Sequence, residues 1–197
     1  MKKYIILMVF FVSVSFAVSA QGFYFDIGFG LGKAWTKVDG YDMVDELKSA
    51  GISVREVAVD LGLKAGYGPF GNIPLYVIGE LGGIGHRIYD SSNYIQFNSY
   101  IFGPGIIFYP IPLIQLGLSL GLSFTGNQTD IPLMYMYDSK GGFAWNISAA
   151  VDLGSRNHGC LLGIKYFSAN NKLETSNADE NASMITFFVK YTYRRKV

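Results

Sequence analysis

The stretch from residue 23 to residue 32, FYFDIGFGLG, has two different faces when it is written as an extended strand. Side chains alternate across a β-strand with a period of two, so each face collects every second residue. One face holds Phe23, Phe25, Ile27, Phe29 and Leu31, and the other holds Tyr24, Asp26 and three glycines. This pattern predicts a strand with one bulky apolar face, and the same pattern recurs along the chain.

Eight such strands are expected after the first twenty residues, each long enough to cross a bilayer when tilted. They cover residues 22–34, 54–67, 73–86, 94–109, 113–125, 142–154, 159–168 and 183–194. The longer connections are 35–53, 87–93, 126–141 and 169–182, and the short turns are 68–72, 110–112 and 155–158. Long loops at one end and short turns at the other are typical of an antiparallel up-and-down membrane barrel.

Composition indicates which face meets lipid. Charged residues make up 16% of the chain and hydrophobic residues 50%, whereas a soluble domain has about 25% charged residues. A soluble lipocalin-like barrel would hide its apolar face inside, but its outer face would then favour Lys, Glu and Thr over Gly, Ala and Ser. Small residues suit the narrow interior of an eight-stranded barrel. We therefore predict an all-β transmembrane barrel with its apolar faces toward lipid.

Aromatic residues near the strand ends support this prediction, because such girdles mark the two membrane interfaces. At the short-turn end the expected girdle residues are Phe23, Tyr67, Tyr109, Tyr191 and Tyr193. At the long-loop end they are Trp35, Phe124, Phe143, Trp145 and Tyr166.

Residues 1–20 have the pattern of a secretory signal peptide. Lys2 and Lys3 precede an apolar run, and Val18, Ser19 and Ala20 form a small-residue cleavage site. The alternative is a transmembrane anchor, but the apolar run is shorter than the ~20 residues that a spanning helix needs. The expected domain organisation is therefore a signal peptide at 1–20 and one barrel domain at 21–197.

Charged residues also occur on the faces that we expect to point into the barrel. They are Asp26, Glu56, Asp60, Lys64, Glu80, Asp152, Lys165, Lys190 and Arg194. Buried charges need partners or hydrogen bonds. We interpret the set as a salt-bridge network that fills the lumen, and the alternative is a narrow polar pore or gate.

The fourth expected strand is interrupted by Gly103, Pro104 and Gly105. Proline lacks the N–H group of a sheet ladder, so it favours a bulge or an edge position. We expect a strand bulge here, and the alternative is a lateral opening for an apolar solute.

Residues with catalytic potential are few. His86 lies near Ser91 and Ser92, and Glu80 or Asp90 could complete a hydrolase-like set. The spacing matches no motif, so no catalytic residues are predicted. The sequence also has no pair of histidines at metal-ligand spacing, no cysteine cluster and no phosphate-binding glycine loop, so no metal or cofactor is expected.

The first long connection contains a short helix signal. Asp42 is a favourable N-cap and Gly51 can end the helix, while Met43, Val44 and Leu47 would form an apolar stripe. We expect this helix to lie over the barrel mouth, and the alternative is a contact surface for an external partner.

Taken together, these features resemble the eight-stranded bacterial outer-membrane barrels of the OmpX, OmpW and OmpA transmembrane-domain type. The resemblance covers residues 22–194 and rests on the strand pattern. It implies a bacterial outer-membrane location, with membrane lipids and the barrel assembly machinery as partners, and a structural or surface-interaction role through the outer loops. The alternatives are an OmpW-like channel for small or apolar solutes and an outer-leaflet lipid-modifying enzyme. A net charge of +1 without a basic patch gives no reason to expect nucleic acid, and no feature indicates an oligomeric state.

Overall fold

A computed structural model describes residues 20–132, 136, 139–154, 157–174 and 178–194. Eight long strands make up most of it: β1 (Ala20–Val38), β3 (Arg55–Phe70), β4 (Leu75–Tyr89), β5 (Tyr94–Ile111), β6 (Ile114–Thr125), β8 (Ser139–Asp152), β9 (His158–Leu173) and β10 (Asp179–Arg194). Three short elements accompany them: β2 (Tyr41–Asp42), α2 (Met43–Ser49) and β7 (Gln128–Thr129). No helix in this part of the chain is long and apolar enough to cross a membrane. Residues 1–19 lie outside the described residues, so the signal peptide stays a prediction.

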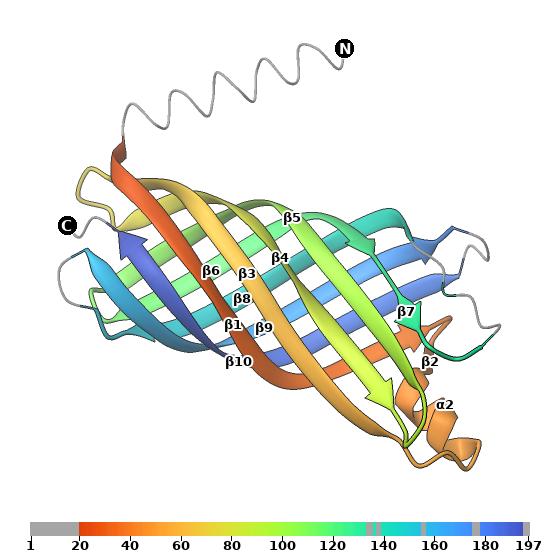
Figure 1. Cartoon of the computed structure of the whole chain (residues 1–197). Coiled ribbons are helices and arrows are strands. Elements are labelled where there is room, and N and C mark those ends of the chain that lie inside the picture. Colours follow the sequence, from red (N-terminus) through yellow and green to blue (C-terminus); the bar gives the residue numbers. More distant parts are fainter. Residues whose placement is uncertain (1–19, 133–135, 137–138, 155–156, 175–177, 195–197) are drawn as a thin grey trace, which may run out of the picture.

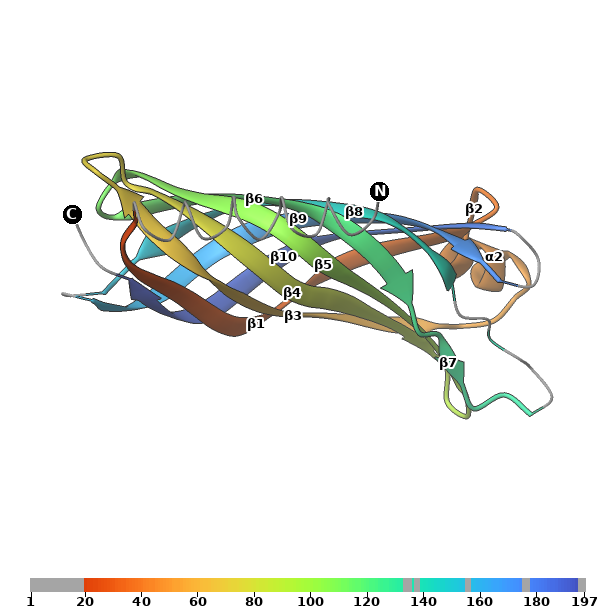
Figure 2. The ribbon, with the colours of Figure 1, turned by 90° about the horizontal axis from the view of Figure 1, so that it is seen from above.

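The long strands form one closed antiparallel barrel. Each pairs with its neighbours in the order β10-β9-β8-β6-β5-β4-β3-β1, and β10 pairs back onto β1. The start of β1 and the end of β10 lie at one end of the barrel, and α2, β2 and β7 lie at the other (Figures 1 and 2). We call these the turn end and the loop end. The predicted eight-stranded up-and-down barrel is confirmed.

The strands are staggered, so the sheet closes with an offset. Directly opposed residues, followed around the barrel from Ala34, lead back to β1 at Tyr24, ten residues closer to the turn end. The residues passed on the way are Met184, Phe167, Asn146, Ser119, Gly105, Ile78 and Gly66. This offset corresponds to strands tilted by about 40° from the barrel axis. It decides which inward side chains meet.

The strand exteriors are apolar, as predicted. Leu118 and Val189 are exposed on the outer face, while Tyr24 and Asp26 on the alternate face of β1 are fully buried. Phe23 and Trp35 lie on one face of β1, twelve residues apart. With a rise of about 3.3 Å per residue and a tilt of about 40°, they are roughly 30 Å apart along the axis, which matches a bilayer core. One expected girdle residue is misplaced: Tyr109 is 2% exposed and points into the lumen.

The strands at the loop end are longer than expected. β9 continues to Leu173 and β10 begins at Asp179, so the connection between them is much shorter than the predicted loop 169–182. The β4–β5 connection is likewise a short turn at 90–93. The physical reason is burial, because the inward residues Ala169 and Ala182 of these extensions remain in the barrel core. The barrel wall therefore continues beyond the apolar band.

Between the apolar band and the loop end, β5 has its apolar side chains on the inner face of the barrel instead of the outer face. The apolar faces of all strands were predicted to point toward lipid, but Ile95 and Phe97 are buried on the inner side together with Ile88. They pack against Val44 of α2, with Leu47 at the edge of the same cluster. The helix forms as predicted, because the Asp42 side chain accepts hydrogen bonds from the first-turn N–H groups. Apolar side chains point inward here because α2 covers them.

The strand bulge expected at Gly103–Pro104–Gly105 is not present. The β5–β6 register is the same on both sides of this segment, and the shift lies instead between Phe108 and Ile111. The strands also approach closely here, since an ideal Cβ on Gly121 would lie 2.7 Å from the Gly103 Cα atom. The β5–β6 pairing is interrupted at Gly103 and Pro104 and resumes in the same register, because proline removes one N–H group from the ladder without adding a residue to the strand.

Candidate functional site in the barrel lumen

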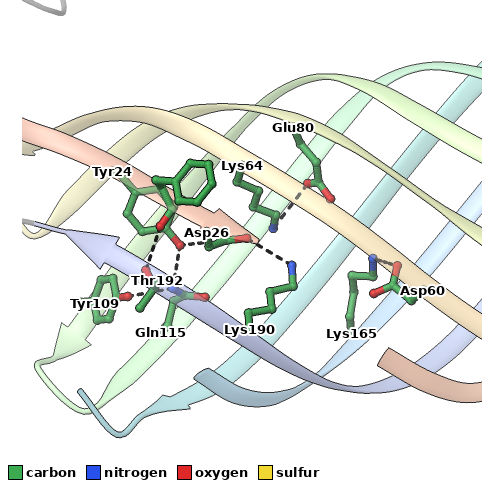
Figure 3. Close-up of polar contacts among 11 residues, drawn as sticks. Tyr24, Asp26, Asp60, Lys64, Glu80, Tyr109, Gln115, Lys165, Lys190 and Thr192 are labelled. Carbon is green, nitrogen blue, oxygen red and sulfur yellow. Dashed lines mark hydrogen bonds and ion pairs between the residues drawn. The ribbon is translucent and has the colours of Figure 1, made fainter. Parts of the chain in front are cut away.

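Three tyrosines cross the lumen near the turn end. The ring centroids of Tyr24 and Tyr76 are 5.2 Å apart, and those of Tyr76 and Tyr109 are 6.0 Å apart. Gln115 Nε2 donates to the hydroxyl groups of Tyr24 (2.9 Å) and Tyr109 (2.8 Å). The Tyr24 hydroxyl donates to Asp26 Oδ2 at 2.6 Å. This aromatic layer joins β1, β4, β5 and β6 at the level where the lumen would open toward the short turns (Figure 3).

Arg194 closes the same end from β10. Its Nε atom donates to Asp152 Oδ2 at 2.9 Å, and its Nη2 atom donates to the Pro112 carbonyl oxygen at 2.9 Å. The guanidinium lies 3.7 Å from the centroid of the Tyr109 ring. Stacking together with charge-assisted hydrogen bonds is characteristic of arginine. The last strand is thereby connected to β5, β8 and the β5–β6 turn.

A layer of ion pairs lies above the tyrosines. Asp26, Lys64 and Glu80 are directly opposed on β1, β3 and β4, so their charges alternate across three neighbouring strands. Lys64 Nζ lies 3.4 Å from Glu80 Oε2, and Lys190 Nζ lies 3.4 Å from Asp26 Oδ1. None of the four side chains is more than 3% exposed. The row is therefore sealed from solvent on the inner side of the barrel.

Lys165 and Asp60 form an ion pair between walls that are not adjacent. Lys165 belongs to β9 and Asp60 to β3, and β10 and β1 separate these strands in the sheet. Figure 3 shows the lysine reaching across the interior to the carboxylate. Small residues make room for such chains, since an ideal Cβ on Gly28 would lie 2.5 Å from Lys190 Cγ. The lysine side chains thus occupy the space that inward glycines leave free.

Charges in this interior are balanced. The acids Asp26, Asp60, Glu80 and Asp152 each pair with one base, and the bases are Lys190, Lys165, Lys64 and Arg194. Removing one member of a buried pair typically costs about 3–5 kcal/mol, because the remaining charge has no counter-ion. The fold therefore depends on every pair being complete.

Glu56 is apart from the other charges predicted for the lumen. It lies at the loop end, 24% exposed, where it forms an ion pair with Lys33 and is within hydrogen-bond distance of His86. His86 Nε2 is 3.1 Å from Glu56 Oε2, and His86 Nδ1 is 2.9 Å from Thr36 Oγ1. These contacts connect β1, β3 and β4 beyond the last backbone pairing of β1 with β3.

Thr36, His86 and Glu56 are in contact in series. Their hydroxyl, imidazole and carboxylate groups follow one another in the same order as in a catalytic triad. Thr36 and His86 are each only 1% exposed, however, so a substrate cannot reach the hydroxyl group. The set considered from the sequence is not assembled either. Ser91 and Ser92 lie in the β4–β5 turn, and Glu80 pairs with Lys64 deep in the lumen.

An apolar layer separates the ion pairs from the loop end. It contains Ile84, Ile101, Phe167 and Met184, together with several alanines. All four are at most 2% exposed. From the turn end to the loop end, the lumen is therefore occupied by tyrosines, ion pairs, this apolar layer, the Thr36 contacts and the cluster beneath α2.

Several buried polar residues were not included in the lumen network predicted from the sequence. Asn146, Asn171 and Glu180 are each at most 3% exposed, and each has a side-chain atom without a hydrogen-bond partner among the described residues. Asn171 and Glu180 were missed because their segment was read as a loop. Their strict alternation with Ala169 and Ala182 was the available signal.

Glu180 lies three residues beyond Ser183, which pairs with the girdle residue Trp35, so it is outside the membrane-spanning part of β10. Burial raises the pKa of Glu180 to about 7, and the hydrogen bond from Asn127 Nδ2 (2.6 Å) opposes this effect in part. Nowhere among the described residues do three His, Cys, Asp or Glu side chains lie close enough to hold a metal ion.

No family model matches the sequence, and no curated protein matches it. Solved structures do match the fold. Neisserial surface protein A (NspA) aligns with a TM-score of 0.56 and 15% identity, covering 89% of this chain and 98% of that chain. Ail, the attachment invasion locus protein of Yersinia pestis, in complex with the heparin analogue sucrose octasulfate, aligns with a TM-score of 0.51 and 17% identity, covering 87% and 97%. With these two proteins, the chain shares the fold of an eight-stranded outer-membrane β-barrel.

Proposed function

We propose that this protein is a bacterial outer-membrane barrel that does not conduct solutes and that acts through the surface at its loop end. The observation that carries this proposal is the filled lumen. Lys64, Lys165 and Glu80 are each at most 1% exposed, so water does not reach the ionic layer from either end. A barrel closed in this way has its ends and its outer wall available for function.

Features of the loop end support a role in contact. The helix α2 is held by its apolar side on the barrel cluster, and its other residues point outward. Tyr41, next to the helix, is 65% exposed, and Ile52, just after it, is 40% exposed. We propose that this surface contacts a ligand outside the cell, with the barrel as its anchor in the membrane.

Planar-bilayer recording tests the closed lumen. The wild-type protein is expected to give no stepwise conductance, because the tyrosine layer, the four ion pairs and the apolar layer block the path through the lumen. Lys64→Ala shortens one side chain of the ionic row and leaves the tyrosine and apolar layers in place, so it is expected to stay silent, as is the control Lys172→Ala on the exterior. Regular wild-type steps would instead support the OmpW-like channel.

Lipid mass spectrometry tests the proposed lack of enzymatic activity. Membranes that contain the wild-type protein, His86→Ala or no barrel are expected to have the same lipid profile, because the Thr36 hydroxyl is inaccessible. A lipid species that appears with the wild-type protein and disappears with His86→Ala would establish a lipid-modifying enzyme.

A further inference from the structure

One buried carboxylate of this barrel has no base beside it. The buried acids of the described strands are Asp26, Asp60, Glu80, Asp152 and Glu180. The first four each form an ion pair with a lysine or an arginine, whereas Glu180 has no base within ion-pair distance among the described residues. An ionised carboxylate that is buried without a counter-charge is costly. Glu180 therefore needs a positive partner.

The contact between Asn127 and Glu180 uses one carboxylate oxygen and leaves the other. Asn127 lies in the connection between β6 and β7, and its Nδ2 atom donates to Glu180 Oε2 at 2.6 Å. The amide is itself held in place, because its Oδ1 atom accepts the backbone N–H group of Asn98 at 3.3 Å. Glu180 Oε1 is buried and has no hydrogen-bond partner among the described residues. The amide thus orients the carboxylate without neutralising its charge.

Glu180 belongs to a row of directly opposed inward residues on four neighbouring strands. The row consists of Ser123 on β6, Gly142 on β8, Asn171 on β9 and Glu180 on β10, and we call it the polar row. Ser123 Oγ and both amide atoms of Asn171 are buried, and in the described part of the chain they also lack hydrogen-bond partners. Directly opposed residues have Cβ atoms about 4.5–5.5 Å apart. A small ion can therefore contact Asn171 and Glu180 at the same time.

Small residues leave room beside the polar row. An ideal Cβ on Gly142 would lie 2.7 Å from Asn171 Oδ1, so the amide uses the space that this glycine leaves. The next inward row toward the turn end is also directly opposed, and it consists of Gly121, Ala144, Ala169 and Ala182. None of these four side chains is larger than a methyl group. The inward neighbours of Asn171 and Glu180 on their own strands are therefore short.

The chemistry of the free atoms indicates a hard cation with a single charge. Carboxylate and amide oxygens are the ligands that hard cations prefer. The other buried acids are balanced one to one by bases, and a monovalent cation would balance Glu180 in the same way, whereas a divalent cation would leave a buried positive charge. A proton would neutralise Glu180 but would leave Asn171 Oδ1 without a partner. Since no three His, Cys, Asp or Glu side chains cluster among the described residues, a transition metal does not fit.

We propose that Glu180 Oε1 and Asn171 Oδ1 bind a monovalent cation, with Na⁺ as the ion available in the medium, at the loop end of the lumen. The cation supplies the counter-charge that lysines supply deeper in the barrel. The apolar layer separates the polar row from the four ion pairs, so exchange with the medium takes place at the loop end. This site is independent of the proposed contact surface around α2.

The test compares the thermal unfolding of full-length proteins in phosphatidylcholine vesicles, in NaCl or in N-methylglucamine chloride at equal ionic strength. The medium is kept at about pH 8, above the pKa of about 7 that burial gives Glu180, so that protons compete little with Na⁺. The proteins are the wild type, Glu180→Gln and Glu174→Gln. Glu174 is the matched control because it is an exposed carboxylate in the turn after β9, at the same end of the barrel.

Na⁺ at tenfold its Kd is expected to raise the midpoint of unfolding of the wild type and of Glu174→Gln by about 3–6 °C. Glu180→Gln should show no rise, because its amide has no charge to be balanced. No rise in the wild type, or an equal rise in Glu180→Gln, would overturn the proposal. A rise with millimolar Ca²⁺ but not with Na⁺ would overturn the assignment to a monovalent ion.

Asn171→Lys provides a second and independent comparison. It places an ammonium group directly opposite Glu180, as Lys64 is directly opposite Asp26. The variant should unfold at the same temperature in both salts, because the lysine replaces the bound cation. Should Glu180→Gln not fold, this variant decides the question, and a folded Asn171→Lys barrel that keeps the wild-type response to Na⁺ would refute the site.

Discussion

At the scale of single residues, this barrel depends on buried charges whose partners come from distant parts of the chain. Lys165 and Asp60 are far apart in sequence and lie on strands that are not neighbours. Such a pair connects opposite walls, which backbone hydrogen bonds in the sheet cannot do. Its removal should therefore affect the whole barrel.

Lys165→Met is expected to lower the free energy of unfolding by about 3–5 kcal/mol, because Asp60 is left charged and unpaired in the lumen. The double variant Asp60→Leu/Lys165→Met removes both charges and should recover most of that loss. The free energies of unfolding of the single and the double variant are measured by urea-induced unfolding in lipid vesicles, with tryptophan fluorescence as the signal. A double variant no more stable than the single one would show that the pair is not the cause.

Glu180 predicts a pH dependence of stability. Its folded-state pKa of about 7 lies above the ordinary value of 4.5, so the folded protein binds more protons between these pH values than the unfolded chain does. Stability should therefore fall as pH rises from 4.5 to 7, by about 2–3 kcal/mol from this group. The variant Glu180→Gln should not show this decrease in stability between pH 4.5 and 7.

The matched control for Glu180 is Glu46→Gln, which changes an exposed carboxylate on α2. Its pH profile of unfolding should follow the wild type. If Glu180→Gln keeps the wild-type slope between pH 4.5 and 7, the carboxyl group does not titrate in that range.

At the scale of the elements, the contact between β5 and β6 depends on glycine. An ideal Cβ on Gly121 would lie 2.3 Å from the Phe102 carbonyl oxygen and 2.7 Å from the Gly103 Cα atom. Both neighbours are backbone, so a methyl group there can be accommodated only if the strands move apart. The sequence pattern led us to expect a bulge at this segment, but the β5–β6 register is the same on both sides of it.

Gly121→Ala is expected to destabilise the barrel by about 1–3 kcal/mol, the usual cost of overpacking. Gly62→Ala is the matched control, because its added Cβ would meet only Lys190 Nζ at 3.5 Å, at the end of a flexible chain. The two variants are compared by gel electrophoresis after heating, in which the folded barrel migrates faster than the unfolded chain. The temperature at which the faster band disappears measures the stability of each variant. Equal shifts would indicate that the β5–β6 approach is not limiting.

The elements at the loop end also show where prediction from the sequence stops. The helix α2 was predictable from Asp42 and from the apolar stripe of Met43, Val44 and Leu47, because these are local signals. The reversal of Ile95 and Phe97 to the inner side was not predictable. Period-two alternation identifies two faces of a strand but does not say where along the strand lipid ends and the helix begins to cover the interior.

At the scale of the whole molecule, the closed barrel predicts a fixed orientation with the loop end outside the cell. In a Cys160→Ala background, a single cysteine introduced as Ser91→Cys lies in the β4–β5 turn at the loop end, and Asn72→Cys lies in a turn at the other end. A membrane-impermeant maleimide on intact cells is expected to label the first and not the second. Lysed cells should show labelling of both, and the reverse pattern on intact cells would invert the orientation.

The local pattern of residues was sufficient to predict the number of strands, their approximate limits and the apolar exterior. Alternation is a property of neighbouring residues, and a lipid-facing wall selects it directly. The charges on the inward face could be named for the same reason. Asp26 and Lys190 follow the strand period as strictly as Phe29 and Val189 do.

The partners of those charges were decided only by the tertiary structure. Which carboxylate meets which lysine depends on the ten-residue offset with which the sheet closes, and no local pattern encodes that offset. The same offset places Tyr109 under Arg194 and brings Thr36 to His86. The sequence alone determined which face each residue lies on, whereas closure of the cylinder determined the contacts across the lumen, because these join strands that are remote in the chain.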